Sequence, residues 1–275
     1  MQCSNPRPLR AAPPPHYNRF LPSAAQLDVV LVSPRNPLNI GAAARAMANF
    51  GFDRLTVVAP FEPHWREACS AVGAEDLLQN ATVSPTLAEA VAACTLVIGT
   101  GSLTFRKPEQ KVVSLPALAP LVQQERARGG RVALVFGPEK HGLTRQDLSW
   151  CQLLAEIPTS PRQPSMNLGQ AVAVCLYELA SLAFPGPAVV PAAPASAQTT
   201  DQNLSAPSGS LDLLAQVIEE TMAAAGYSPR SMQAANRHDL RLLLRRLAPT
   251  PRDTRRILGL FRRILWRLQQ AHERN

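Results

Sequence analysis

The sequence predicts an α/β fold built on a parallel sheet, followed by a small α-helical domain. Over the first two thirds of the 275 residues, short runs rich in valine, leucine and isoleucine alternate with alanine-rich helical patterns, as in strand–helix–strand units. A stretch of small and polar residues then separates this region from arginine-rich helical patterns. We expect a disordered leader at residues 1–25, an α/β domain at 26–184, a flexible linker at 185–210 and a basic helical domain at 211–275.

The elements of the α/β domain follow from hydrophobic periodicity. Apolar runs predict strands at residues 28–32, 55–59, 82–84, 96–100, 132–136 and 153–157. Helical patterns cover residues 39–50, 65–72, 86–93, 115–128 and 168–184. Thr144 and Asp147 have the spacing of a helix cap, which predicts one more short helix after residue 144.

The C-terminal region is expected to form helices at residues 211–225 and 239–247 and a third helix after Pro251. Leucines at 240, 243, 244 and 247 recur at helical spacing and form one apolar stripe. Two or three short helices make only a marginal core by themselves. We therefore expect this tail to pack on the main domain or on a second subunit.

Composition limits the class of protein. Apolar residues make up 46% of the chain, but no apolar run approaches the roughly 20 residues that cross a bilayer, so we expect a soluble protein. The first 25 residues lack the apolar stretch of a secretory signal. Five widely spaced cysteines without a CxxC pair argue against a disulfide framework or structural zinc. These features favour a cytoplasmic protein without a metal site.

The net charge of +8 is distributed unevenly. Residues 230–275 hold twelve arginines against three acidic residues, a net charge of +9, so the rest of the chain is close to neutral. A guanidinium offers a planar fork of donors that suits phosphate. The tail therefore favours a nucleic acid partner, and a solvated helix face is the alternative.

The first informative motif, SPRNPLNIGAAARAM at residues 33–47, directly follows the first strand and opens a helix. We expect Asn39 to cap the free amides of this helix and Gly41 to permit close backbone approach. Arg45 would then present a cation one turn further on. This arrangement suits a phosphate or a ribose-phosphate, although a lone arginine near a helix start is often only a surface residue.

Two further motifs follow later strands. VALVFGPEKHGLT at residues 132–144 runs from a buried strand into a loop with a glycine on either side of Glu139. Such a loop is typical of ligand contact through main-chain groups. IPTSPRQPSMNLG at residues 157–169 places Ser165 and Asn167 directly before a helix, where a simple helix cap is the alternative reading.

Several common enzyme classes lack support. No GxGxxG lies between the first strand and the first helix, and Gly99 and Gly101 after a later strand lack a third glycine. The sequence also has no Walker loop, no GxSxG elbow and no pair of histidines at metal-ligand spacing.

Together the three motifs resemble the TrmH-like branch of the SPOUT methyltransferases, and most of all its TrmJ-type tRNA 2′-O-methyltransferases. The resemblance covers residues 27–184 through N-x-G-x-x-x-R-A-M, F-G-x-E-x-x-G-L-T and S-x-N-L, and extends more weakly to the tail. It implies a parallel-sheet SPOUT domain with a C-terminal trefoil knot and a homodimer formed through the knot region. The implied reaction is S-adenosylmethionine-dependent methylation of a ribose 2′-hydroxyl in tRNA, at nucleotide 32 of the anticodon loop. A ribosomal RNA 2′-O-methyltransferase and a non-catalytic knotted RNA-binding protein remain the alternatives.

The resemblance also implies roles for individual residues. S-adenosylmethionine is expected to be held, largely through backbone, by Thr100, Gly101, Ser102, Gly137, Ile157, Ser165, Met166 and Leu168. The implied catalytic set is Arg45, Ser165, Asn167, Asn39 and Glu139. Candidate RNA contacts are Arg35, Lys140, Arg162, Arg241, Arg245, Arg256 and Arg263.

Because a guanidinium is a poor base at neutral pH, we expect Arg45 to act as an electrostatic clamp on the ribose hydroxyl, with a phosphate or Ser165 passing on the proton. Removal of the tail after Leu211 should weaken tRNA binding and leave cofactor affinity nearly intact.

Overall fold

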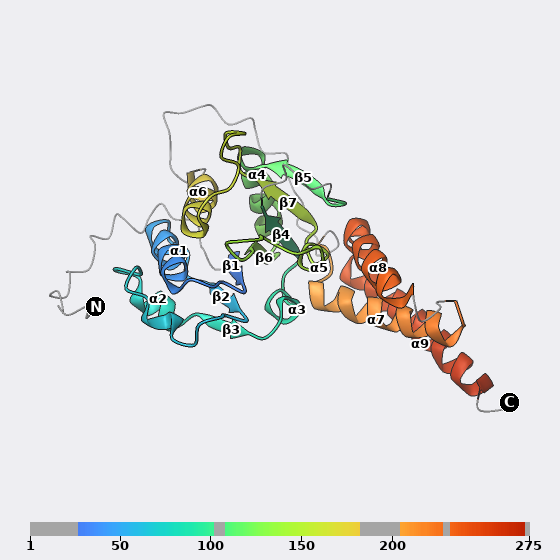
Figure 1. Ribbon diagram of the computed structural model, residues 1–275. Coiled ribbons are helices and arrows are strands. Elements are labelled where there is room, and N and C mark those ends of the chain that lie inside the picture. The colour runs from blue at the N-terminus through green and yellow to red at the C-terminus, as the bar shows by residue number, and fades with distance from the viewer. Residues whose placement is uncertain (1–26, 102–107, 182–203, 228–231, 273–275) are drawn as a thin grey trace, which may run out of the picture.

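A seven-stranded parallel sheet forms the centre of the first domain in the computed structural model (Figure 1), which describes residues 27–101, 108–181, 204–227 and 232–272. The strand order is β3-β2-β1-β6-β4-β7-β5. The strands are β1 (Leu27–Val32), β2 (Leu55–Val58), β3 (Thr82–Ser84), β4 (Leu96–Thr100), β5 (Lys111–Ser114), β6 (Val132–Phe136) and β7 (Leu153–Glu156). The expected α/β class with a parallel sheet is confirmed, whereas the trefoil knot stays a prediction.

The central strands β1 and β6 are buried along their whole length, which explains why their sequences are continuous apolar runs and do not alternate with polar residues. Successive side chains of β1 point to opposite faces. Val29 and Leu31 belong to a core with α1 and α6, while Val30 and Val32 belong to a second core beside α3. The domain is thus a sheet covered on both faces.

The helices of this domain are α1 (Pro37–Asn49), α2 (Glu75–Gln79), α3 (Leu87–Ala90), α4 (Leu115–Ala127), α5 (Arg145–Leu148) and α6 (Leu168–Ser181). Five of them lie where helices were expected, including the short helix after Thr144, whose side chain forms the predicted cap with Asp147. α2 and the edge strand β5 were not predicted. Both are short, and β5 carries three exposed residues that hide its strand pattern.

The helix predicted at residues 65–72 is wrong, because only Trp65–Glu67 form a short 3-10 helix, η3. Tertiary contacts override the local pattern here. The Ser70 hydroxyl donates to the carbonyl of Leu38 in α1 at 2.7 Å. Gly41 makes this approach feasible, since a Cβ at that position would lie 2.2 Å from the Ser70 hydroxyl. The absence of a side chain at Gly41 therefore accommodates a neighbouring segment of the chain.

The tail forms the three expected helices, α7 (Ser208–Ala224), α8 (Gln233–Leu247) and α9 (Pro251–His272), which lie together beside α3 and α5 (Figure 1). The end of the predicted linker needs correction. Ala206 is fully buried, and the Ser208 and Gly209 amides donate to the carbonyls of Cys94 and Ala92. The chain is therefore packed against the first domain from about residue 206, whereas residues 1–26 and 182–203 lie outside the described residues.

Within the described ranges, no helix combines the length and the apolar character needed to span a membrane.

Candidate active site

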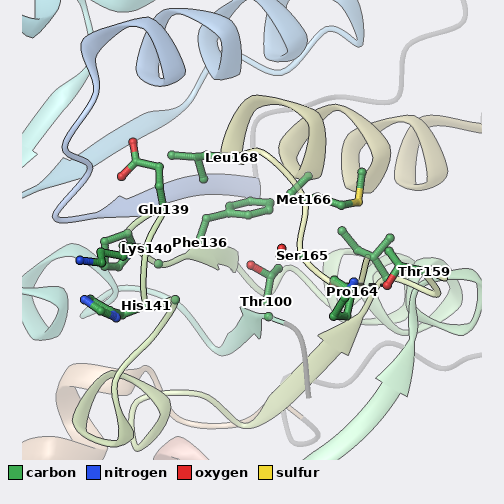
Figure 2. Close-up of a pocket in the computed structure, with 16 residues that line it drawn as sticks. Thr100, Phe136, Glu139, Lys140, His141, Thr159, Pro164, Ser165, Met166 and Leu168 are labelled. Atoms are coloured by element: carbon green, nitrogen blue, oxygen red, sulfur yellow. Dashed lines mark hydrogen bonds between the residues drawn. The ribbon is translucent and has the colours of Figure 1, made fainter. Parts of the chain in front are cut away.

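A cavity of about 410 Å³ opens at the carboxyl ends of β4, β6 and β7 (Figure 2). This is the edge where parallel sheets bind ligands, and the volume falls in the usual range of roughly 300–1,000 Å³ for small-molecule sites. Its walls are Thr100, Gly101, Phe136, Gly137, Pro138, Glu139, Lys140, His141, Gly142, Ile157, Thr159, Pro164, Ser165, Met166, Leu168 and Ala171. Of the eight residues expected to hold the cofactor, seven line this cavity, and Ser102 lies outside the described residues.

The loop after β6 folds back so tightly that only glycine fits at its start. A Cβ on Gly137 would lie 2.2 Å from the amide nitrogen of Leu143 and 2.3 Å from the carbonyl carbon of Gly142. The Gly142 amide donates to the Pro138 carbonyl at 2.8 Å, and Gly142 itself has a φ of +63°. The backbone of residues 137–142 therefore borders the cavity directly, as expected for recognition through main-chain groups.

The other walls combine apolar and small polar side chains. Phe136, Ile157, Met166 and Leu168 supply apolar surface, which suits a planar base. The Thr100 hydroxyl is engaged within the sheet, since it donates to the Val135 carbonyl at 2.9 Å. Thr100 can therefore offer a ligand its backbone more readily than its side chain.

A chain of polar contacts joins the three motifs beside the cavity. Glu139 accepts hydrogen bonds from the amides of Arg35 and Asn36, each at 3.1 Å, and from Asn39 Nδ2 at 2.9 Å. Asn39 Oδ1 in turn accepts from Asn167 Nδ2 at 2.8 Å. Figure 2 shows the Glu139 carboxylate pointing toward the start of α1. Glu139 thus ties the loop after β6 to α1, and Asn39 ties α1 to the segment before α6.

The electrostatics of Glu139 agree with this role. Burial raises the pKa of its carboxyl, but the hydrogen bonds from Asn39 and from the backbone outweigh burial and leave the pKa below its ordinary value. Glu139 is therefore held as a carboxylate at neutral pH. A carboxylate committed to three donors is a tether for the loop and a poor proton acceptor for a substrate.

Asn39 does not cap α1 as expected. The capping residue is Asn36, whose side chain accepts from the Leu38 amide at 3.0 Å, while Asn39 lies inside the first turn. The place near this helix start that the sequence suggested for a phosphate is taken by the Glu139 carboxylate, a negative charge that also suits a helix N-terminus. Asn167 does cap α6, because its Oδ1 accepts from the amides of Gly169 and Gln170.

Arg45 is not brought into the cavity of its own chain. It lies on the exposed side of α1 and is absent from the cavity walls. It follows Asn39 by six residues, which corresponds to about 9 Å along the helix axis and about 120° around it. Asn39, Glu139, Ser165 and Asn167 therefore gather at the cavity or its edge, whereas Arg45 stands apart from them.

The seven candidate RNA contacts divide into two groups. Five of them, Arg35, Lys140, Arg162, Arg256 and Arg263, are exposed. Arg245 is only 3% exposed and donates to the Trp150 carbonyl at 3.1 Å and to the Ser208 hydroxyl at 3.0 Å. Burial lowers the pKa of the Arg245 guanidinium to about 10. Arg241 donates to the Ser149 hydroxyl and stacks 4.1 Å from the Trp150 ring centre.

The assignment of Arg245 and Arg241 to RNA contact is therefore corrected. Both guanidinium groups are used inside the protein, where they join α8 to the segment that follows α5. Charge composition cannot separate these anchoring arginines from the exposed ones.

Sequence reasoning also missed some residues of the cavity. Ala171 could have been found by periodicity, since it lies one helical turn after Leu168. Thr159 has no comparable signal. Its hydroxyl donates to the Pro164 carbonyl at 3.2 Å, and this closure of the loop is a tertiary feature. Across the part of the chain that the structure describes, no cluster of three or more His, Cys, Asp or Glu could hold a metal ion.

Comparison with known proteins gives a consistent result. The model of the SpoU rRNA Methylase family matches residues 26–177. The tRNA (cytidine/uridine/adenosine-2′-O-)-methyltransferase TrmJ of Pseudomonas aeruginosa is 41% identical over 155 residues, which is 56% of this chain and 60% of that protein. The tRNA (cytidine/uridine-2′-O-)-methyltransferase TrmJ of Klebsiella pneumoniae is 31% identical over 255 residues, covering 90% of this chain and 98% of that protein.

Among solved structures, TrmJ from Z. mobilis ZM4 superposes with a TM-score of 0.73 at 30% identity, covering 87% of this chain and 99% of that one. The similarity therefore extends through both the sheet domain and the helical tail. On these grounds the chain belongs to the SpoU rRNA Methylase family, and within it to the TrmJ type.

Proposed function

We propose that this protein methylates the ribose 2′-hydroxyl of nucleotide 32 in the anticodon loop of tRNA, with S-adenosylmethionine as methyl donor. Membership of the family establishes the reaction type, a 2′-O-methyl transfer that uses this donor. The observation that carries the proposal is the cavity, because loops that follow three different strands meet there around exposed backbone. The tRNA substrate is supported by TrmJ-type relatives that match this chain along nearly their whole length.

The cavity suits the methyl donor. Apolar side chains at Ile157, Met166 and Leu168 can hold a base, and the backbone around Gly101 and Gly137 can meet polar groups. Open space remains beside Gly101, where an added Cβ would touch nothing within 4 Å. When bound, S-adenosylmethionine supplies a methyl group on a sulfonium, whose departure as a neutral thioether requires no acid.

The protein must then activate the ribose hydroxyl, which is a weak nucleophile. The guanidinium of Arg45 would lower the pKa of that hydroxyl by stabilising the developing alkoxide. Ser165 is exposed at the cavity wall, and in this proposal its hydroxyl or an RNA phosphate relays the proton to solvent. Asn39, Asn167 and Glu139 link the loop after β6, the start of α1 and the segment that carries Ser165.

Arg45→Ala tests this role directly. We expect the rate at saturating S-adenosylmethionine and tRNA to fall by about 100-fold, the usual order for loss of one group that stabilises developing charge, while the affinity for S-adenosylmethionine stays within about twofold. An unchanged rate would exclude Arg45 from the chemistry.

A homodimer formed through the knot region is part of the proposal. Leu38 of α1 and Val174 and Tyr177 of α6 are 50%, 36% and 57% exposed, and α1 and α6 lie against one another. These exposed apolar side chains on two neighbouring helices suit contact with a second copy. Such contact would also place another chain beside Arg45. Sedimentation analysis should give twice the chain mass for the wild type, and Tyr177→Asp should shift the protein toward the monomer.

The exposed arginines of α9 form the proposed RNA-contacting surface of the tail. Arg256 and Arg263 are exposed, and their helix extends away from the sheet domain (Figure 1). Each phosphate contact releases a counterion. Arg256→Gln together with Arg263→Gln should therefore weaken tRNA binding and reduce the slope of log affinity against log salt by about 1–2. If the slope does not change, this helix does not contact phosphate.

The target nucleotide can be tested with synthetic tRNA that lacks one hydroxyl. A tRNA with 2′-deoxyribose at nucleotide 32 should accept no methyl group, while the matched tRNA with 2′-deoxyribose at nucleotide 34 should be methylated like the unmodified one. The reverse result would assign nucleotide 34. Methylation of ribosomal RNA in preference to either tRNA would overturn the tRNA assignment.

A further inference from the structure

Helix α5 connects the cofactor loop after β6 to β7, yet it has only four residues. A helix of one turn is unstable by itself, so its position depends on what surrounds it. The preceding residue Leu143 is 1% exposed and ends the loop that begins at Gly137. Whatever fixes α5 therefore also fixes the end of that loop.

On one side, α5 is held by the residues that precede β5. Gln110 Nε2 donates to the Leu148 carbonyl at 2.7 Å, and Arg145 Nη2 pairs with Glu109 Oε1 at 3.1 Å. The side chains of Arg145 and Glu109 are both exposed, so this ion pair contributes little to stability. The Gln110 contact is partly buried and is the firmer of the two.

On the other side, α5 and the two residues after it are held by α8, which lies next to α5 in Figure 1. Arg145 Nε donates to His238 Nε2 at 3.2 Å. Arg241 donates to Ser149 Oγ at 3.0 Å, and Arg245 donates to the Trp150 carbonyl at 3.1 Å.

The Trp150 ring strengthens this contact. The guanidinium groups of Arg241 and Arg245 lie 4.1 Å and 4.8 Å from its centre. Trp150 is 7% exposed, and cation–π contacts are strongest where water is excluded. This surface between α8 and residues 145–150 is thus a specific, partly buried junction, and we call it the α8 brace.

We propose that the α8 brace holds the cofactor loop in its binding shape and that His238, Arg241 and Arg245 are positioning residues for S-adenosylmethionine. The inference rests on the proposed function, since it assumes that this donor occupies the cavity. With α8 in place, the ordering of residues 137–150 is achieved before the donor binds. Without the contacts from α8, donor binding would itself have to order residues 137–150, and the entropy lost in doing so would weaken the binding. None of the three residues touches the cavity, so they act through residues 143–150.

The α8 brace changes the expectation for tail removal. The sequence alone suggested that loss of the tail would leave cofactor affinity nearly intact. The contacts of α8 indicate that the tail and the cofactor site are coupled, and such coupling is reciprocal. Bound S-adenosylmethionine should therefore also stabilise the attachment of the tail.

Arg241→Ala in the full-length protein is the central test, with Arg246→Ala as matched control. Arg246 lies on the same helix but is exposed. By calorimetric titration with S-adenosylmethionine, Arg241→Ala should raise the dissociation constant about fivefold or more, the usual size of coupling between sites, and Arg246→Ala should leave it unchanged. At saturating donor, the methylation rate of Arg241→Ala should stay within about twofold of wild type, since only the loop-ordering step is affected.

Two further variants separate positioning from general stability. His238→Ala should also weaken donor binding, and His238→Gln should restore it because its amide oxygen can accept from Arg145. In Arg241→Ala, amide hydrogen exchange should quicken at residues 137–148. A lower melting temperature with an unchanged dissociation constant would show a purely structural role and overturn the inference.

The two proposals fail in different ways. If the wild type binds no S-adenosylmethionine, the proposed function fails. If the wild type binds it and the Arg241→Ala and His238→Ala variants bind equally well, only the brace fails. An Arg246→Ala effect as large as that of Arg241→Ala would also overturn the brace, because it would reflect charge alone.

Discussion

Glu139→Gln tests whether one carboxylate ties the cofactor loop to α1. One carboxylate oxygen accepts from Asn36 and Asn39, and the other accepts from the Arg35 amide. A glutamine amide has a single oxygen, so its NH₂ group would face the Arg35 amide, donor against donor. The substitution removes one hydrogen bond and the negative charge, while the size of the side chain is kept.

The magnitude follows from these contacts. A hydrogen bond to a charged group contributes about 1.5–3 kcal/mol, and because Glu139 is largely exposed, solvent screening reduces the expected loss to about 1–2 kcal/mol. For a chain of this size, that corresponds to a melting temperature lower by about 2–8 °C. The methylation rate should fall as well, since the loop loses its bond to the Arg35 amide and its remaining bonds from Asn36 and Asn39 no longer go to a charged acceptor.

The effect should depend on pH in one direction. The folded-state pKa of Glu139 lies below its ordinary value of 4.5, so its contribution is fully present above that value and is lost as the pH falls through the folded pKa. Wild type and Glu139→Gln should therefore differ in melting temperature at pH 7 and converge in acid. Glu62→Gln, at an exposed position in the loop after β2, is the control. A constant difference across this pH range would refute the reasoning.

Two more predictions concern a tight turn and a buried ion pair. Gly137→Ala should abolish S-adenosylmethionine binding in calorimetric titration while the fold is retained, because its Cβ would collide with the backbone of residues 142 and 143. A Cβ at Gly101 would meet nothing within 4 Å, so Gly101→Ala should reduce the affinity far less. Equal losses of affinity in the two variants would point to simple filling of the cavity. Asp28→Asn should lower the free energy of unfolding by about 3 kcal/mol in denaturant titration, because buried Asp28 accepts from Arg54 and Arg131. Asp53→Asn, at an exposed position, should have no such effect.

The parallel sheet could be predicted because its buried central strands are recognisable as apolar runs in the sequence. β1 and β6 are uninterrupted apolar runs, and a strand buried on both faces needs no other signal. β5 could not be found in this way, because it lies next to β7 at the edge of the sheet and exposes three of its four residues. The missing helix at residues 68–72 shows a second limit, since contact with α1 decides that segment.

The residues that line the cavity were largely predictable for a different reason. Glycines and polar residues that directly follow buried strands must meet at one edge of a parallel sheet. Partners within the site were harder to foresee. Nothing local indicates that Glu139 would reach back across 100 residues to Asn39, and this pairing turned the expected helix cap into a link between motifs.

The tail shows why charge alone predicts partners poorly. All its arginines contribute equally to the net charge, yet Arg245 is 3% exposed and so even more buried than the apolar Leu244 beside it, which is 5% exposed, while Arg256 faces solvent. The difference arises because Trp150, which lies two residues after α5, contacts Arg245 of α8 through its ring and accepts a hydrogen bond from it at its carbonyl. Under the two proposals above, α8 supports the methyl-donor site and α9 contacts RNA. Because α9 contacts α7 and α7 contacts α8, tRNA bound on α9 would be linked to the donor cavity through these helices. Arg241→Ala should therefore also reduce the dependence of tRNA affinity on donor concentration.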